Sequence, residues 1–149
     1  MPGYRVHLLG GALAGGATLM AATRFNWIVA DRPTQACLLA ITLAASLFPD
    51  VDTPSAGRPW FYGALAVADA ALIATRRYFW ASLLGFLALF PAIGGHRGWT
   101  HSWWAALLVP LPLLLGPMEL LGMGWRAALP WYLAAVIGYV SHLLLDGEW

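Results

Sequence analysis

Six apolar segments divide the chain, and they constrain its fold more than any other feature. They run over residues 8–23, 33–48, 60–75, 78–94, 102–121 and 127–145, with Arg, Pro, Asp or Gly between them. A helix needs about 20 apolar residues to cross the ~30 Å hydrocarbon core of a bilayer. Several segments are shorter, and tilting or local thinning of the bilayer can make up the difference. The pattern predicts an all-α transmembrane bundle of about six helical segments, with four to six crossings.

The composition agrees with a membrane protein that forms one domain over residues 1–149. The chain is 60% hydrophobic and 10% charged, and its mean hydropathy is +0.68. Because its net charge is only +1, it has no strongly basic face, and nucleic acid is not an expected partner. Cys37 is the only cysteine, which excludes a disulfide framework and a thiolate metal cluster. The expected partner is the lipid bilayer.

Two segments contain residues that predict how their helices pack. The first gathers small residues, namely Gly10, Gly11, Ala14, Gly15 and Ala17. Small residues let helices approach closely in lipid, although Gly and Ala are also common in membrane helices generally. Pro110, Pro112 and Pro117 crowd the fifth segment, and they predict a kinked or broken helix there.

Polar residues gather at the ends of the apolar segments in four groups. These are His7, PDVD at residues 49–52, GHRGWTHS at residues 95–102 and SHLLLD at residues 141–146. If all six segments cross the bilayer, the four groups lie on one side of it. Treating 60–75 and 78–94 as a re-entrant pair preserves this result. Three arginines on that side against five opposite favour an extracytoplasmic position by the positive-inside rule.

His142 and Asp146 lie four residues apart, so they share one face of a helix. Imidazole nitrogen and carboxylate oxygen both suit zinc, so the pair can act as a two-ligand arm. A hydrogen-bonded His–Asp pair without metal is an equally good interpretation.

Asp50 and Asp52 follow Pro49 in a turn from which both carboxylates can point inward. Two carboxylates at this spacing suit one metal ion, or one ligand and one general base. Taken alone, a solvated turn is the better interpretation of this sequence.

His96 and His101 are five residues apart, which aligns them poorly on a straight helix. Three glycines within residues 94–98 predict a loop that brings both imidazoles onto one site. Arg97 beside them fits an anion clamp, since guanidinium binds phosphate or carboxylate in a bidentate manner. Snorkelling of Arg97 to the membrane interface is the alternative.

In this order, the early His7 and the patterns PDxD, HRGxTHS and GYxSHLLxD resemble the YdjM-like family of membrane-bound, metal-dependent hydrolases. That family is distantly similar to the zinc-dependent phospholipase C and single-strand nuclease group. The resemblance implies metal ligands at His7, Asp50, His96, His101, His142 and Asp146, with Asp52 as a ligand or base. It also implies a bacterial or archaeal cytoplasmic (inner) membrane. The stretch between Asp52 and His96 is longer than the family pattern, as though a helical hairpin were inserted.

The resemblance, together with these motifs, implies metal-dependent hydrolysis of a phosphoester, with a lipid head group as a candidate substrate. A divalent ion, expected to be zinc, would activate water, and Asp52 and Arg97 are the expected catalytic residues. The chain has no G-x-S-x-G elbow, which argues against a serine hydrolase. Two other functions fit the same residues. One is a metal or proton transporter that also uses Asp69 or Glu119, and the other is a non-catalytic scaffold or sensor with a structural metal.

Overall fold

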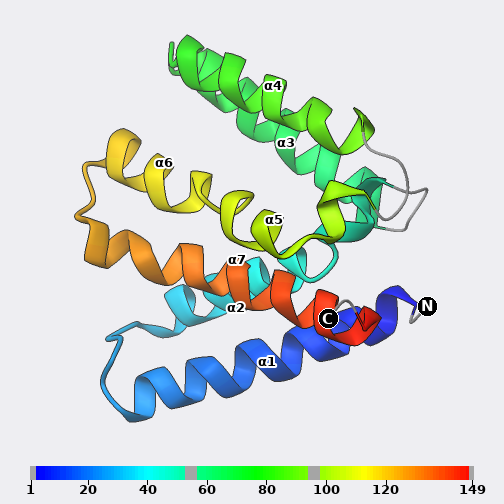
Figure 1. Cartoon of the computed structure of the whole chain (residues 1–149). Helices are drawn as coiled ribbons and strands as arrows, with labels where there is room; N and C mark the ends of the chain where they lie inside the picture. Colours follow the sequence, from blue (N-terminus) through cyan, green and yellow to red (C-terminus); the bar gives the residue numbers. More distant parts are fainter. Residues whose placement is uncertain (1–2, 53–56, 94–97, 148–149) are drawn as a thin grey trace.

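The computed structural model describes residues 3–52, 57–93 and 98–147, and these are helical apart from short connections (Figure 1). The side chains of Asp52, Gly57 and residues 90–93 lie outside this description. The helices are α1 (Tyr4–Arg24), α2 (Arg32–Ala45), α3 (Gly57–Ala74), α4 (Tyr78–Ile93), α5 (Trp103–Leu108), α6 (Pro112–Leu121) and α7 (Trp125–Asp146), with the 3-10 turns η1 (Phe48–Asp52) and η2 (Trp99–His101). The all-α prediction is confirmed, and each of the six expected segments corresponds to a helix or, for the fifth, to a broken one.

Prolines break the fifth segment where the sequence predicts it. α5 ends at Leu108 and α6 begins at Pro112, with a turn between them. Pro112 occupies the start of α6, where a missing N–H costs no helical hydrogen bond. Pro117 lies inside α6 without ending it.

Three helical stretches among the described residues are long and apolar enough to cross a membrane. They are α1, the α5–α6 stretch Trp103–Leu121, and α7, with mean hydropathies of 1.3, 1.7 and 1.5. Large apolar side chains are exposed on all three, for example Leu13 on α1, Leu107 on α5 and Leu133 on α7, as expected for surfaces that face lipid. Crossing by α2, α3 and α4 stays a prediction.

Helix α7 lies at the centre of the bundle and packs against α1, α2 and α6 (Figure 1). The small residues of α1 form a packing face, as predicted. A Cβ atom at Gly11 would lie 2.6 Å from Ser46 Oγ, and one at Gly15 would lie 2.8 Å from Thr42 Cγ2. Only glycine at these positions allows α1 to approach α2 so closely.

The stretch between the second and fifth segments forms a helical hairpin of α3 and α4, in agreement with the sequence expectation. The two helices pack against each other and against η1. Figure 1 shows the hairpin extending away from α1, α2 and α7. The hairpin therefore joins the bundle mainly through the turn that contains Asp50.

Candidate metal centre

Five of the predicted site residues lie together at one end of the bundle. His7 lies on α1, Asp50 on η1, His101 on η2, and both His142 and Asp146 on α7. The beginning of α1 and the end of α7 lie side by side at this end (Figure 1). The structure brings these five residues together, and the crossing parity that predicted one membrane side for them stays a prediction. The side of the membrane that they face stays a prediction.

Local structure explains how the ligand-type side chains come together. His142 and Asp146 lie one turn apart on α7, with His142 Nε2 3.4 Å from Asp146 Oδ2. α7 ends directly after Asp146, where Gly147 adopts a left-handed φ of 74° that glycine favours. Asp50 and His101 lie in the 3-10 turns η1 and η2, which contact each other.

Four side chains form a group that could hold a metal ion: Asp50, His101, His142 and Asp146. One ligand atom from each lies within 4.8 Å of all the others. His101 Nε2 is 3.5 Å from Asp146 Oδ2, and both His101 Nε2 and His142 Nε2 are 3.8 Å from Asp50 Oδ1. A tetrahedral zinc ion with bonds of ~2.0–2.1 Å holds its ligands about 3.3 Å apart. The group therefore needs only small shifts to coordinate such an ion.

The hydrogen bonding of His142 tests whether a cation fits. Its Nδ1 lies 2.8 Å from the carbonyl oxygen of Ser46. Because a carbonyl only accepts, Nδ1 carries the proton, and Nε2 of the neutral ring presents a lone pair. This Nε2 is buried without a hydrogen-bond partner among the described residues, and it faces the Asp50 and Asp146 carboxylates.

A buried lone pair opposed to carboxylate oxygens is unfavourable unless a metal cation or a proton lies between them. Donation of the second ring N–H to a backbone carbonyl is also the usual arrangement of a metal-bound histidine. The side chains of His142 and Asp146 are 0% and 2% exposed, whereas that of Asp50 is 23% exposed. The residues therefore fit a divalent ion in a mostly dry site with one accessible side.

His7 contacts this group from outside it. Its Nε2 lies 3.3 Å from Asp146 Oδ1, and its ring stacks on that of His142 with centroids 3.8 Å apart. Asp146 thus presents one oxygen to His7 and the other to His101 and His142. The resemblance implies a ligand at His7, and this role stays a prediction.

Three predicted site residues cannot be placed. The Asp52 backbone belongs to η1, but its side chain lies outside the described part of the chain, as do His96 and Arg97 entirely. Their predicted roles as ligands, base or anion clamp stay predictions.

Sequence reasoning did not assign a supporting role to Ser46, Thr100 or Tyr139. The Tyr139 hydroxyl donates a buried hydrogen bond to the Thr100 carbonyl, and Thr100 Oγ1 lies 3.3 Å from His101 Nδ1. Tyr139 and Thr100 occur within the GYxSHLLxD and HRGxTHS patterns, which is the signal that could have identified them. Ser46 acts through its backbone, so its side chain gives no such signal.

We expect Tyr139→Phe to weaken metal binding by about 10–100-fold, the usual effect of losing a hydrogen bond that orients a metal ligand. The substitution keeps the ring but removes the donor that fixes η2, and with it His101. The measurement is a competition titration against a chromophoric chelator in detergent. Tyr132→Phe is the matched control, because it removes a similar bond to the Leu107 carbonyl on an exposed surface. Equal losses in both variants would contradict the assignment.

Comparison with known proteins gives one family match. The family model described as YdjM inner membrane protein matches residues 1–149. No curated protein and no solved structure matches the chain significantly.

Proposed function

The chain belongs to the YdjM inner membrane protein family, and we propose that it is a membrane-bound, metal-dependent phosphoester hydrolase. One observation carries the proposal: the ligand atoms of Asp50, His101, His142 and Asp146 converge within 4.8 Å. Two imidazoles and two carboxylates form a donor set that suits zinc. The family and the apolar helices show an integral protein of the inner membrane.

A divalent ion in this group would supply Lewis-acid activation of water and stabilise negative charge on a phosphoryl group. Contacts within the chain orient two of the ligand side chains for that ion. The Ser46 carbonyl fixes the tautomer of His142, and Asp146 contacts three imidazoles. In the same proposal, Asp52 accepts a proton from water and Arg97 binds the phosphoryl oxygens.

The position of the group supports an enzyme over a transporter. A transport path would need polar residues along the membrane-spanning helices. The group instead lies where the ends of several elements meet. Asp69 on α3 and Glu119 on α6 are not members of it. The partial exposure of Asp50 supports a catalytic site over a purely structural one, because structural metal sites are closed to water.

The test begins with elemental analysis of the protein purified in detergent, followed by hydrolysis of bis(p-nitrophenyl) phosphate. We expect bound transition metal, activity that a chelator removes, and recovery when zinc is added back. His101→Ala is expected to lose at least about 100-fold in rate, because substitutions behind a ligand already cost 10–100-fold. A protein without metal would refute the site. A metal-loaded protein that hydrolyses neither this ester nor phospholipids would refute the hydrolase and favour a scaffold.

A further inference from the structure

His7 and His142 form a stacked pair of imidazoles beside the four-residue group of Asp50, His101, His142 and Asp146. Their ring centroids lie 3.8 Å apart, and their ring planes differ by only 16°. His7 lies one turn into α1, and His142 lies one turn before the end of α7. The side chains are 1% and 0% exposed. The pair therefore brings two buried imidazoles to one place from two different helices.

Asp146 divides its two carboxylate oxygens between the stacked rings. His142 Nε2 lies 3.4 Å from Asp146 Oδ2, and His7 Nε2 lies 3.3 Å from Asp146 Oδ1. Oδ2 also faces His101 Nε2 at 3.5 Å, so it is the oxygen that suits an ion in the four-residue group. Oδ1 faces His7 instead. The carboxylate can therefore bind one ion through Oδ2 and another through Oδ1.

The surroundings of Asp146 Oδ1 call for a positive charge. This oxygen is buried without a hydrogen-bond partner among the described residues, although His7 Nε2 lies 3.3 Å away. A buried carboxylate oxygen in that state is costly unless a positive charge lies next to it. A metal ion between Oδ1 and His7 Nε2 would supply the charge and coordinate both atoms. A proton on His7 would supply the charge alone.

The spacing of the stacked rings favours the metal ion. Both Nε2 atoms approach the same carboxylate, so two ions bound by them would lie roughly one ring separation apart, about 3.8 Å. Ions about 3.5–4 Å apart form the two-metal sites of phosphatases and nucleases, where they stabilise the attacking and the leaving oxygen of one displacement. The stacked pair and its shared carboxylate therefore have the dimensions of a two-metal site.

We propose that His7 Nε2 and Asp146 Oδ1 bind a second divalent ion, so that Asp146 bridges two ions at the stacked pair. The four-residue group binds the first ion. Water and phosphoryl oxygens of the substrate complete the coordination of the second, as is usual for catalytic metal ions. This inference rests on the metal centre of the proposed function and adds to it a two-ion site for a phosphoester.

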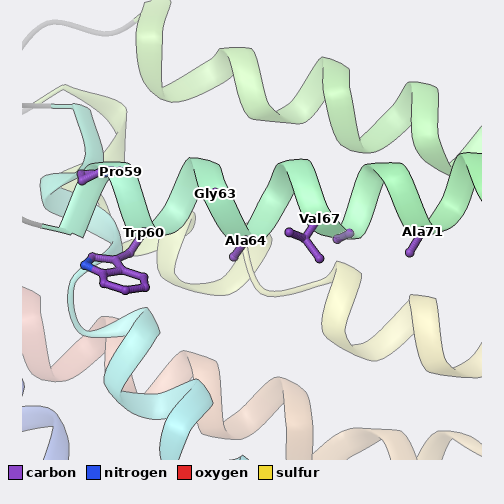
Figure 2. A pocket seen from close by; sticks show the side chains of 7 residues that line it. Pro59, Trp60, Gly63, Ala64, Val67 and Ala71 are labelled. Carbon is purple, nitrogen blue, oxygen red and sulfur yellow. The ribbon is translucent and has the colours of Figure 1, made fainter.

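The binding test counts zinc ions per chain by elemental analysis, after the protein in detergent has been dialysed against a fixed free zinc concentration. We expect two ions in the wild-type protein and one in His7→Phe. Phenylalanine keeps a flat ring against His142 but has no metal-binding nitrogen. Ala64→Phe is the matched control and should keep both ions. It introduces the same ring on a face of α3 that is lined by apolar side chains without metal-binding groups (Figure 2).

Each count of bound zinc decides between the one-ion and the two-ion centre. One ion in the wild-type protein would overturn this inference, because His7 would then only hydrogen-bond to Asp146, while the proposed function would stand. Two ions in both the wild-type protein and His7→Phe would also overturn it, because the second ion would lie elsewhere. A wild-type protein without zinc would refute the metal centre of the proposed function as well.

A spectroscopic measurement tests the bridge without any variant. Zn²⁺ has a filled d shell and gives no electron paramagnetic resonance signal, so the metal-free protein is loaded with Co²⁺ instead. We expect the signal of isolated ions at one equivalent and magnetic coupling between the ions at two equivalents, because Asp146 bridges them. Two uncoupled Co²⁺ ions would overturn the inference, and this result would hold even if His7→Phe failed to fold.

Discussion

Asp146→Asn is expected to weaken binding of the divalent metal by on the order of a hundredfold. The apparent binding free energy of structural zinc in small domains is roughly 10–16 kcal/mol. Divided evenly over four ligands, this gives about 3 kcal/mol per ligand, and each 1.4 kcal/mol is tenfold in affinity. Asp146 should reach at least this average, because its side chain is 2% exposed and three imidazoles contact it.

The physical reason is loss of charge in a dry site. Asparagine has nearly the shape of aspartate, so packing at the end of α7 is preserved. Its amide is neutral, however, and Coulomb attraction to a divalent ion is strongest where water is excluded. The measurement is a chelator competition titration, with the unfolding temperature in detergent reported alongside to show that the variant remains folded.

Asp50→Asn is the comparison within the same group. The Asp50 side chain is 23% exposed, so a water molecule can take its place as a ligand. Its loss in affinity should therefore be much smaller, roughly tenfold on the scale of outer-shell substitutions. If Asp146→Asn kept wild-type affinity, Asp146 would not be a ligand, and its contacts with the three histidines would be hydrogen bonds alone.

The helical segments could be predicted because hydrophobicity and proline placement are local properties of a sequence. The break between α5 and α6 is an example, since Pro110 and Pro112 lie at it. Crossing parity likewise predicted one side of the membrane for Asp50, His101 and Asp146, because it needs only the order of the segments. Neither argument depends on how two helices pack.

The hydrogen bonds that orient the ligands could not be predicted, because they depend on packing between distant parts of the chain. The Ser46 carbonyl meets His142 only because α2 and α7 cross where they do, 96 residues apart in sequence. Every residue has a carbonyl, so nothing in the sequence distinguishes this one.

Gly138→Ala should lower stability and metal affinity together, because Gly138 lies at the crossing of α7 with α2. A Cβ atom there would overlap the Thr42 carbonyl oxygen, and it would lie 3.1 Å from Ala45 Cβ. A backbone carbonyl cannot rotate away as a side chain can, so the helices must separate. Overpacking of this kind typically costs about 1–3 kcal/mol.

Separation of the helices at this crossing also changes the metal centre. Gly138 and Thr42 each lie one helical turn before a residue that joins the two helices there. Gly138 is four residues before His142 on α7, and Thr42 is four before Ser46 at the end of α2. Separation at the crossing therefore lengthens the 2.8 Å contact between His142 Nδ1 and the Ser46 carbonyl. We expect a lower unfolding temperature in detergent and about 10–100-fold weaker metal binding, the effect of losing such a partner.

Two controls separate this cause from a general effect of alanine. Gly116→Ala on α6 meets nothing within 4 Å, so it should keep or raise stability through better helix propensity. Thr42→Ala should fail to rescue Gly138→Ala, because the overlap is with the backbone of residue 42 and not with its side chain. Rescue by Thr42→Ala, or wild-type metal affinity in Gly138→Ala, would show that the crossing does not position His142.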